Sequence, residues 1–304
     1  MKIGATIFPA VLLALSLVLG PAGAHAQSLD AELDSAGGGG VRIGQSLVEP
    51  VAPDGAPGEV DTGVDTGALA APKQEYLPVI LSTVPAPMVV ELFTSEGCSS
   101  CPPADALLGE LTQRQYVLPL SFHVDYWDYI GWKDRFADPL FTQRQRAYAE
   151  VQGSSMVYTP QMIIAGAIDV VGSDRQAVER ALKRAYTRNT MYRIQVVREK
   201  DGSVVAQFPE APIGVPATIW LLTYQKSAES KVKAGENAGR NLMTYNVVRS
   251  LQKVGMWYGP ATEIELKLDP AAKANSPDAC AIIANQAEHG PIIAAAAFNF
   301  TKAW

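Results

Sequence analysis

The chain is poor in residues that bind metals: its 304 residues include only 3 cysteines and 3 histidines. A closed structural zinc site takes four nitrogen or sulfur ligands. After residue 26 the candidates are scattered along the chain: Cys98, Cys101, Cys280, His123 and His289. The sequence therefore predicts no metal site, and no motif in it implies an organic cofactor.

An excess of charge is also absent from most of the chain. The whole sequence has 25 lysines and arginines against 31 acidic residues, but nine of those acids and three of those bases precede Val79. The remainder is balanced and has no basic stripe. Because proteins that bind nucleic acid carry a basic surface, neither nucleic acid nor an anionic membrane surface is an expected partner.

Long hydrophobic runs are missing except at the start of the chain. The run at residues 7–19 follows a single charge, Lys2, and precedes Ala24-His25-Ala26. A run of about 13 residues is too short to span a bilayer, and the small residues after it are typical of a cleavage site. Residues 1–26 are therefore interpreted as a secretory signal peptide. The mature chain is expected to be periplasmic or secreted, where disulfides persist, with no membrane span.

Aromatic residues are scarce in the next segment. Residues 27–78 contain one, Tyr76, together with four consecutive glycines and nine acids against two bases. Such a segment cannot bury enough apolar surface to offset the entropy lost on ordering. We therefore expect a disordered acidic linker over residues 27–78.

What the chain does have is a pair of cysteines in C-x-x-C spacing. Cys98 and Cys101 follow an apolar run at residues 88–93 and precede leucines at helical spacing. The start of a helix favours a thiolate, and a disulfide there can form and break readily. The pair is either a redox pair, a structural disulfide or a set of metal ligands. Cys98 is expected to be the exposed sulfur, with Cys101 covered by the helix.

Local patterns predict the elements around this pair. Strands are expected at residues 88–93, 116–124, 161–164 and 168–171, and helices at about 104–113, from residue 139 and after Ser173. Pro102 and Pro103 are the reason for the late start of the first helix, because a proline disfavours helical geometry in the residue before it. Short strands follow at 217–224, 242–248, 264–268, 280–285 and 292–300, with a charged loop at 225–240.

This order of elements resembles the thioredoxin fold. Tyr158-Thr159-Pro160 strengthens the resemblance, since a Thr-Pro pair opens the third strand in that superfamily. The runs at 92–105 and 123–128 are similar to a narrower family of exported bacterial thioredoxin-like proteins of unassigned function. The resemblance implies an α/β thioredoxin-like domain at 79–189, followed by an all-β sandwich-like domain at 190–304. It also implies a cis Thr159–Pro160 bond, with Pro160 against the disulfide.

Other candidate residues have two readings each. His123 stands near the carboxyl end of a predicted strand, where sites collect, and either orients a thiol or is a satisfied core residue. The loop with Trp127 is either a platform for a protein substrate or a packing element. Cys280 lies in an apolar strand and is either an inert buried thiol, the interpretation favoured here, or a resolving partner.

These features together predict an exported thiol–disulfide oxidoreductase acting on protein or small-molecule thiols and disulfides. Cys98 attacks, a mixed disulfide forms and Cys101 resolves it. Thr159, Pro160, His123 and Trp127 are the expected residues of the substrate groove. The alternatives are a non-catalytic extracytoplasmic binding protein with a structural disulfide, and a copper carrier.

Overall fold

The computed structural model describes residues 78–303, apart from 84–85, 189–190 and 275–276. The predicted signal peptide, residues 27–77 of the predicted linker and the predicted domain boundary at 189–190 lie outside the described residues. Within the described part, no helix is both long and apolar enough to cross a membrane.

The elements follow one another along the chain in a mixed order. They are β1 (Val79–Ile80), β2 (Met88–Thr94), α1 (Pro102–Leu111), β3 (Val117–His123), the 3-10 helix η1 (Asp128–Ile130), α2 (Pro139–Val151), β4 (Gln161–Ile164), β5 (Ile168–Val171), α3 (Arg175–Arg188), β6 (Tyr192–Arg193), β7 (Gln195–Arg198), β8 (Val204–Phe208), β9 (Ala217–Lys231), β10 (Asn241–Trp257), β11 (Thr262–Glu265), α4 (Pro270–Ala274), β12 (Ala279–Gln286), β13 (Ile292–Asn299) and α5 (Phe300–Ala303).

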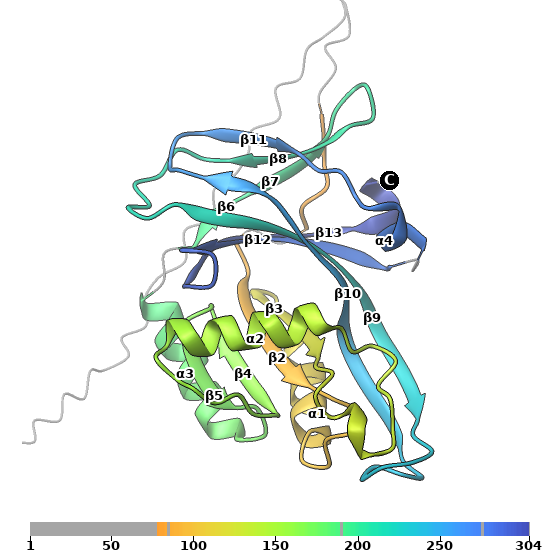
Figure 1. Cartoon of the computed structure of the whole chain (residues 1–304). Helices are drawn as coiled ribbons and strands as arrows, with labels where there is room; N and C mark the ends of the chain where they lie inside the picture. Colours follow the sequence, from red (N-terminus) through yellow and green to blue (C-terminus); the bar gives the residue numbers. More distant parts are fainter. Residues whose placement is uncertain (1–77, 84–85, 189–190, 275–276, 304) are drawn as a thin grey trace, which may run out of the picture. The chain divides into compact units, whose positions relative to one another are not determined.

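Most strands belong to one mixed sheet of nine strands, in the order β5-β4-β2-β3-β10-β9-β12-β13-β6 (Figure 1). β2 and β10 both run parallel to β3, whereas β2 pairs antiparallel with β4, and the pairs from β10 to β13 are antiparallel. A second sheet has the order β1-β7-β8-β11. β2 and β3 are buried along their whole length, which is why their sequences are nearly continuous apolar runs.

The predicted fold class, an α/β thioredoxin-like domain followed by an all-β sandwich-like domain, is wrong. β10 pairs with β3 at Val247 and Ser121, so strands from both parts of the chain form one curled sheet. Pro119 of β3 has no N–H to donate. Its carbonyl accepts a hydrogen bond from the side-chain amide of Asn246, at 2.8 Å. A side chain thus supplements the backbone pairing where the two parts of the sheet meet.

Three hydrophobic cores show how the sheet is covered. α1 and α3 pack on one face of β2 and β4, with Val90, Leu108 and Leu182 in that core. α2 packs on the other face, and because the sheet curls, its core also includes side chains from β9, β12 and β13. The four-stranded sheet covers the opposite face of these last strands. The carboxyl ends of β2 and β3 are left at one end of the sheet, where loops cover them.

The β9–β10 hairpin is long enough to extend beyond the part of the sheet in which β9 also pairs with β12. Its strands have 15 and 17 residues, which corresponds to a hairpin about 50 Å long. Residues 217–224 pair with β12, and the remainder of β9 pairs only with β10. Figure 1 shows the hairpin extending to the end of the sheet where β2 and β3 finish. The predicted charged loop at 225–240 is therefore strand over residues 225–231, and only residues 232–240 form a tip between the strands (the hairpin tip).

Candidate functional site

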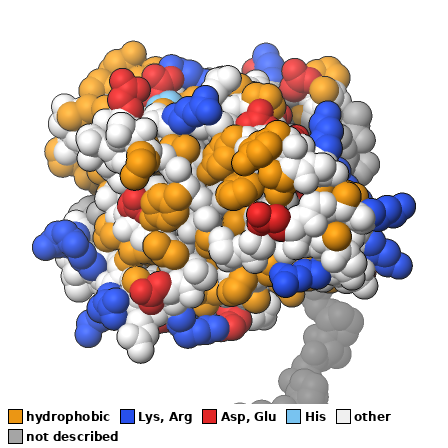
Figure 2. All heavy atoms as spheres, turned by 60° about the horizontal axis from the view of Figure 1, so that its bottom comes forward, with side chains coloured by type: hydrophobic (Ala, Val, Ile, Leu, Met, Phe, Trp, Pro, Cys, Tyr) orange, Lys and Arg blue, Asp and Glu red, His pale blue; other side chains and the backbone are white. Residues whose placement is uncertain are grey.

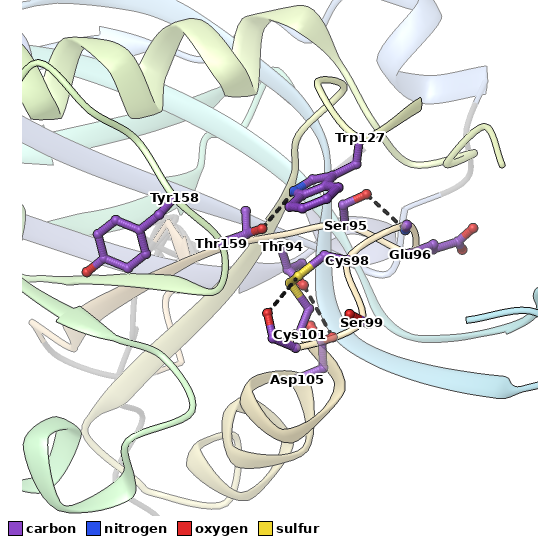
Figure 3. Close-up of a disulfide and its surroundings, with 12 residues drawn as sticks. Thr94, Ser95, Glu96, Cys98, Ser99, Cys101, Asp105, Trp127, Tyr158 and Thr159 are labelled. Carbon is purple, nitrogen blue, oxygen red and sulfur yellow. Dashed lines mark hydrogen bonds between the residues drawn. A yellow bond between two sulfur atoms is a disulfide. The ribbon is translucent and has the colours of Figure 1, made fainter. Parts of the chain in front are cut away.

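The cysteine pair lies in the turn between β2 and α1. Cys98 and Cys101 form a disulfide, and Cys101 is the N-cap of α1 (Figure 3). The Cys101 N–H donates to the Cys98 carbonyl at 3.2 Å, which closes the turn. α1 begins at Pro102 rather than near residue 104. Proline is tolerated in the first helical positions because their N–H groups have no partner within the helix.

Both half-cystines are completely buried, with 0% of each residue exposed. The expectation of an exposed Cys98 is therefore wrong for the oxidised protein. The loop around η1 packs directly on the turn, since a Cβ built on Gly97 would lie 3.1 Å from Trp127 Cβ and 3.3 Å from Ile130 Cδ1. Ser100 is exposed, and its hydroxyl lies 3.4 Å from Cys98 Sγ.

Trp127 and Thr159 form a bridge beside the disulfide. The Trp127 indole N–H donates to Thr159 Oγ1 at 2.8 Å, and Figure 3 shows the two side chains turned towards each other next to the cysteine turn. The Thr159–Pro160 bond is cis, which confirms that part of the prediction. Pro160 is buried, and its contact with the disulfide stays a prediction.

The exposed side chains of the two bridged segments include large apolar ones. Tyr129 is 82% exposed and Met156 is 76% exposed. The face of the molecule that lies at the bottom of Figure 1 carries hydrophobic side chains over its middle, with lysines and arginines mainly towards its edges (Figure 2). A polypeptide would therefore find apolar surface on this face.

Asp105 lies four residues after Cys101, so the two side chains share one face of α1. Thr94 Oγ1 donates to one oxygen of the buried carboxyl at 3.2 Å. The other oxygen has no hydrogen-bond partner among the described residues. Burial raises the pKa of Asp105 to about 7, even though His123 and the bond from Thr94 act to lower it. A carboxyl whose pKa is raised by burial thus lies one helical turn after Cys101.

His123 ends β3 and lies opposite Thr94 in the parallel register. Its Nδ1 is 2.6 Å from Asp134 Oδ2, and both side chains are buried. Burial acts to lower the pKa of His123, but the carboxylates of Asp134, Asp105 and Glu96 together raise it. Burial acts to raise the pKa of Asp134, yet His123 and three hydrogen bonds lower it. The two residues therefore form a buried ion pair, and His123 contacts Asp134 rather than a cysteine.

The hairpin tip also contacts the cysteine turn. Asn237 is completely buried and donates to the carbonyls of Glu96 and Cys98, each at 2.9 Å. The Ser99 N–H donates to Glu236 Oε2 at 3.3 Å. The cysteine turn is thus held between the η1 loop and a hairpin that lies more than a hundred residues away in sequence.

Sequence reasoning found only part of this constellation. Cys98, Cys101, Trp127 and Thr159 are brought together, whereas Asp134 and Asn237 had no predicted role. The spacing of four residues between Cys101 and Asp105 is a signal that identifies the carboxyl. Asp134 and Asn237 carry no such signal, because their contacts cross loops. Cys280 is buried in β12, where burial raises its pKa to about 12.

The described residues contain no cluster of three or more histidines, cysteines or acids placed to hold a metal ion.

Comparisons with known proteins match this site to a family without giving it a role. A sequence model described as "Protein of unknown function (DUF1223)" matches residues 89–285, which include the cysteine turn, Thr159 and the hairpin tip. The crystal structure of protein AGR_C_4864 from Agrobacterium tumefaciens is similar at 29% identity and a TM-score of 0.59, over 70% of this chain and 93% of that one. HBP35 of Porphyromonas gingivalis gives 13% identity and a TM-score of 0.46, over 73% and 77%. No curated protein matches this chain. The chain therefore belongs to the DUF1223 family, whose function is unknown.

Proposed function

We propose that the protein is an exported thiol–disulfide oxidoreductase, periplasmic or secreted, that acts on protein or small-molecule thiols through Cys98 and Cys101. The observation that carries the proposal is the buried carboxyl of Asp105, four residues after Cys101 on α1. A disulfide that serves only stability gains nothing from this neighbour, because a buried polar atom without a partner costs about 1–3 kcal/mol. Perturbed carboxyls of this kind collect at sites that transfer protons.

The chemistry proceeds in two exchange steps. In the reducing direction, the Cys98 thiolate attacks one sulfur of a substrate disulfide, and one substrate thiolate leaves. The Cys101 thiol then gives its proton to the Asp105 carboxylate, and its sulfur attacks Cys98 Sγ. The bond between Cys98 and the substrate breaks, and the second substrate thiolate leaves. Two electrons pass to the substrate, and the same steps in reverse oxidise a substrate dithiol.

Other residues of the site have supporting roles in this proposal. The start of α1 and the Ser100 hydroxyl favour the Cys98 thiolate. Trp127, Thr159 and Pro160 form the wall over which a substrate approaches. Because both sulfurs are buried and the η1 loop packs on Gly97 of the same turn, the proposal requires a movement of this turn or loop before a substrate sulfur reaches Cys98.

That burial is also the specific observation that favours a second candidate. A binding protein that keeps the disulfide only for stability would bury both sulfurs in the same way, and the apolar side chains near Trp127 would then form its binding surface. The two candidates differ in the rate of thiol exchange, which is slow for an inaccessible structural disulfide.

The test measures dithiothreitol-driven reduction of a protein disulfide by the mature chain. Cys98→Ser and Cys101→Ser are expected to abolish turnover, and Cys101→Ser is expected to accumulate a mixed disulfide at Cys98. Cys280→Ser is the matched control, because its thiol is buried in a separate core, and it should retain turnover. A wild-type rate equal to that of Cys98→Ser would reject the oxidoreductase and favour the structural disulfide.

A further inference from the structure

Two neighbouring side chains of the hairpin tip contact the cysteine turn, and they differ in chemical character. We propose that Asn237 and Glu236 tune the redox potential of the Cys98–Cys101 disulfide in opposite directions. Asn237 acts as a positioning residue that favours the dithiol, and Glu236 acts as a negative charge that favours the disulfide. The inference deepens the proposed function and rests on it, in that it treats the pair as one that cycles.

Asn237 is unusual for its location. The tip around it is largely exposed at Lys233, Glu236 and residues 238–240, whereas Asn237 itself is 0% exposed. Arg240 Nη1 donates to its side-chain oxygen at 3.0 Å. That bond fixes which end of the amide is the donor, and the NH2 group faces the turn. The buried side-chain amide of Asn237 thus donates two hydrogen bonds and accepts one, so it holds the cysteine turn in place and is not a solvated surface group.

The two bonds from Asn237 determine where two carbonyl dipoles point. The carbonyl oxygens of Glu96 and Cys98 are both directed at its amide nitrogen. Without Asn237 each carbonyl loses a donor, and the Cys98 carbonyl keeps the Cys101 N–H at 3.2 Å. The negative ends of the two carbonyls are then less neutralised beside the neighbouring sulfur. That would destabilise the Cys98 thiolate and leave the neutral disulfide almost unaffected. Loss of Asn237 therefore shifts the equilibrium towards the disulfide.

Glu236 has the opposite effect on the same sulfur. Its carboxylate accepts the N–H of Ser99, which is the first amide after Cys98. An amide in this position is a donor that a Cys98 thiolate would otherwise use. The carboxylate also places a negative charge beside that thiolate. Because Glu236 is exposed, salt should screen its charge.

The experiment measures the equilibrium between the full mature chain and a dithiothreitol series, with reduced and oxidised forms counted by alkylation and mass. Asn237→Ala is expected to shift the equilibrium constant about fivefold towards the disulfide, the effect of losing about one net hydrogen bond. Glu236→Gln is expected to shift it about threefold towards the dithiol, and less at high salt. A tenfold change corresponds to about 30 mV. The pKa of Cys98, from alkylation rates against pH, should rise in the first variant and fall in the second.

The matched control is Asn241→Ala, the same substitution at an exposed position on the same hairpin, and it should leave the equilibrium unchanged. General loosening of the turn would move both variants in the same direction, so shifts of the same sign overturn the inference. Shifts smaller than those of Asn241→Ala also overturn it. If Asn237→Ala does not fold, the sign of the Glu236→Gln shift decides. Turnover is measured separately from the redox equilibrium. If the two variants shift the equilibrium in opposite directions but the wild-type protein has no turnover, the proposed enzymatic function is rejected and the effect of the hairpin tip on the redox potential stands.

Discussion

Asp105 follows Cys101 by one turn of α1, and its amide N–H donates to the Cys101 carbonyl at 3.1 Å. The same residue thus completes the first turn of the helix with its backbone and places its carboxyl under the end of β2, where Thr94 donates to it. Folding buries an acid whose charged form water would have stabilised. The cost of burying that charge is measurable as a dependence of stability on pH.

The first prediction concerns that pH dependence. The pKa of Asp105 is about 7 in the folded protein, above its ordinary value of 3.8. Between these two values the folded state holds a proton that the unfolded chain has lost, so Asp105 makes stability fall as pH rises from about 4 to 7. The penalty at pH 8 is on the order of 4 kcal/mol. Asp105→Asn should therefore be more stable than wild type at pH 8. This stability advantage should be lost at pH 4, where the wild-type carboxyl is protonated. Urea denaturation of the oxidised proteins at the two pH values measures the difference.

The second prediction concerns the rate at which the mixed disulfide resolves. Without the Asp105 carboxylate, the Cys101 thiol loses the base that we propose receives its proton. Removing a general base typically slows a step about 100-fold or more. Stopped-flow mixing of reduced Asp105→Asn with a small disulfide should show slow release of the second thiol. The first step, attack by Cys98, should be slowed far less. Equal slowing of both steps would contradict the role given to Asp105.

The third prediction concerns access to the buried sulfurs. Trp127→Phe removes the indole N–H that bonds Thr159, at 2.8 Å, and keeps an aromatic ring on the loop. Loss of about 1 kcal/mol of loop stabilisation corresponds to a roughly fivefold faster opening. Reduction of the disulfide by dithiothreitol should accelerate by that factor. Tyr129→Phe, on the same loop with an 82% exposed side chain, is the control and should not change the rate. A slower or unchanged reduction of Trp127→Phe would contradict the bridge as a barrier.

The sequence predicted the elements whose signals are local. The hairpin of β4 and β5 around Gly166 has the expected bounds. α2 begins at residue 139 as expected, and Asp138 caps it by accepting the N–H of Leu140. At α3 the side chain that accepts a backbone N–H is that of Asp174, from Ala177, rather than that of Ser173. In each case the residues that determine the geometry are within a few positions of one another.

The parts that could not be predicted depend on contacts between distant segments. The curled sheet depends on the pairing of Val247 with Ser121 and on a side-chain bond from Asn246 to Pro119. Proline inside a strand ordinarily argues against a central position, so nothing in β3 points to a partner on that side. Asn237 contacts Cys98 across 139 residues. In the sequence it is one polar residue in a charged segment, which by itself indicates a solvated loop.

A buried ion pair connects the site's central strand to the helix behind it. Arg144 Nε of α2 donates to Glu91 Oε1 of β2 at 2.7 Å, and both side chains are almost completely inaccessible. Tyr148 donates to the same carboxylate, and Asn285 of β12 accepts from Arg144 at 3.0 Å. The network therefore connects three elements of the curled sheet's inner core, at positions where the surrounding side chains are apolar.

The last prediction is that removing one partner of this ion pair destabilises the protein much more than replacing both partners. Arg144→Met leaves the Glu91 carboxylate buried without its cation, which costs about 3–5 kcal/mol. The double variant with Glu91→Leu as well should recover much of that loss, because apolar side chains of similar size replace a buried pair at little cost. Arg175→Ala is the matched control: its partner Glu110 is exposed, and such pairs contribute about 0–1 kcal/mol. Urea midpoints measure all three. If Arg144→Met lost no more stability than Arg175→Ala, the pair would not hold α2 against the sheet.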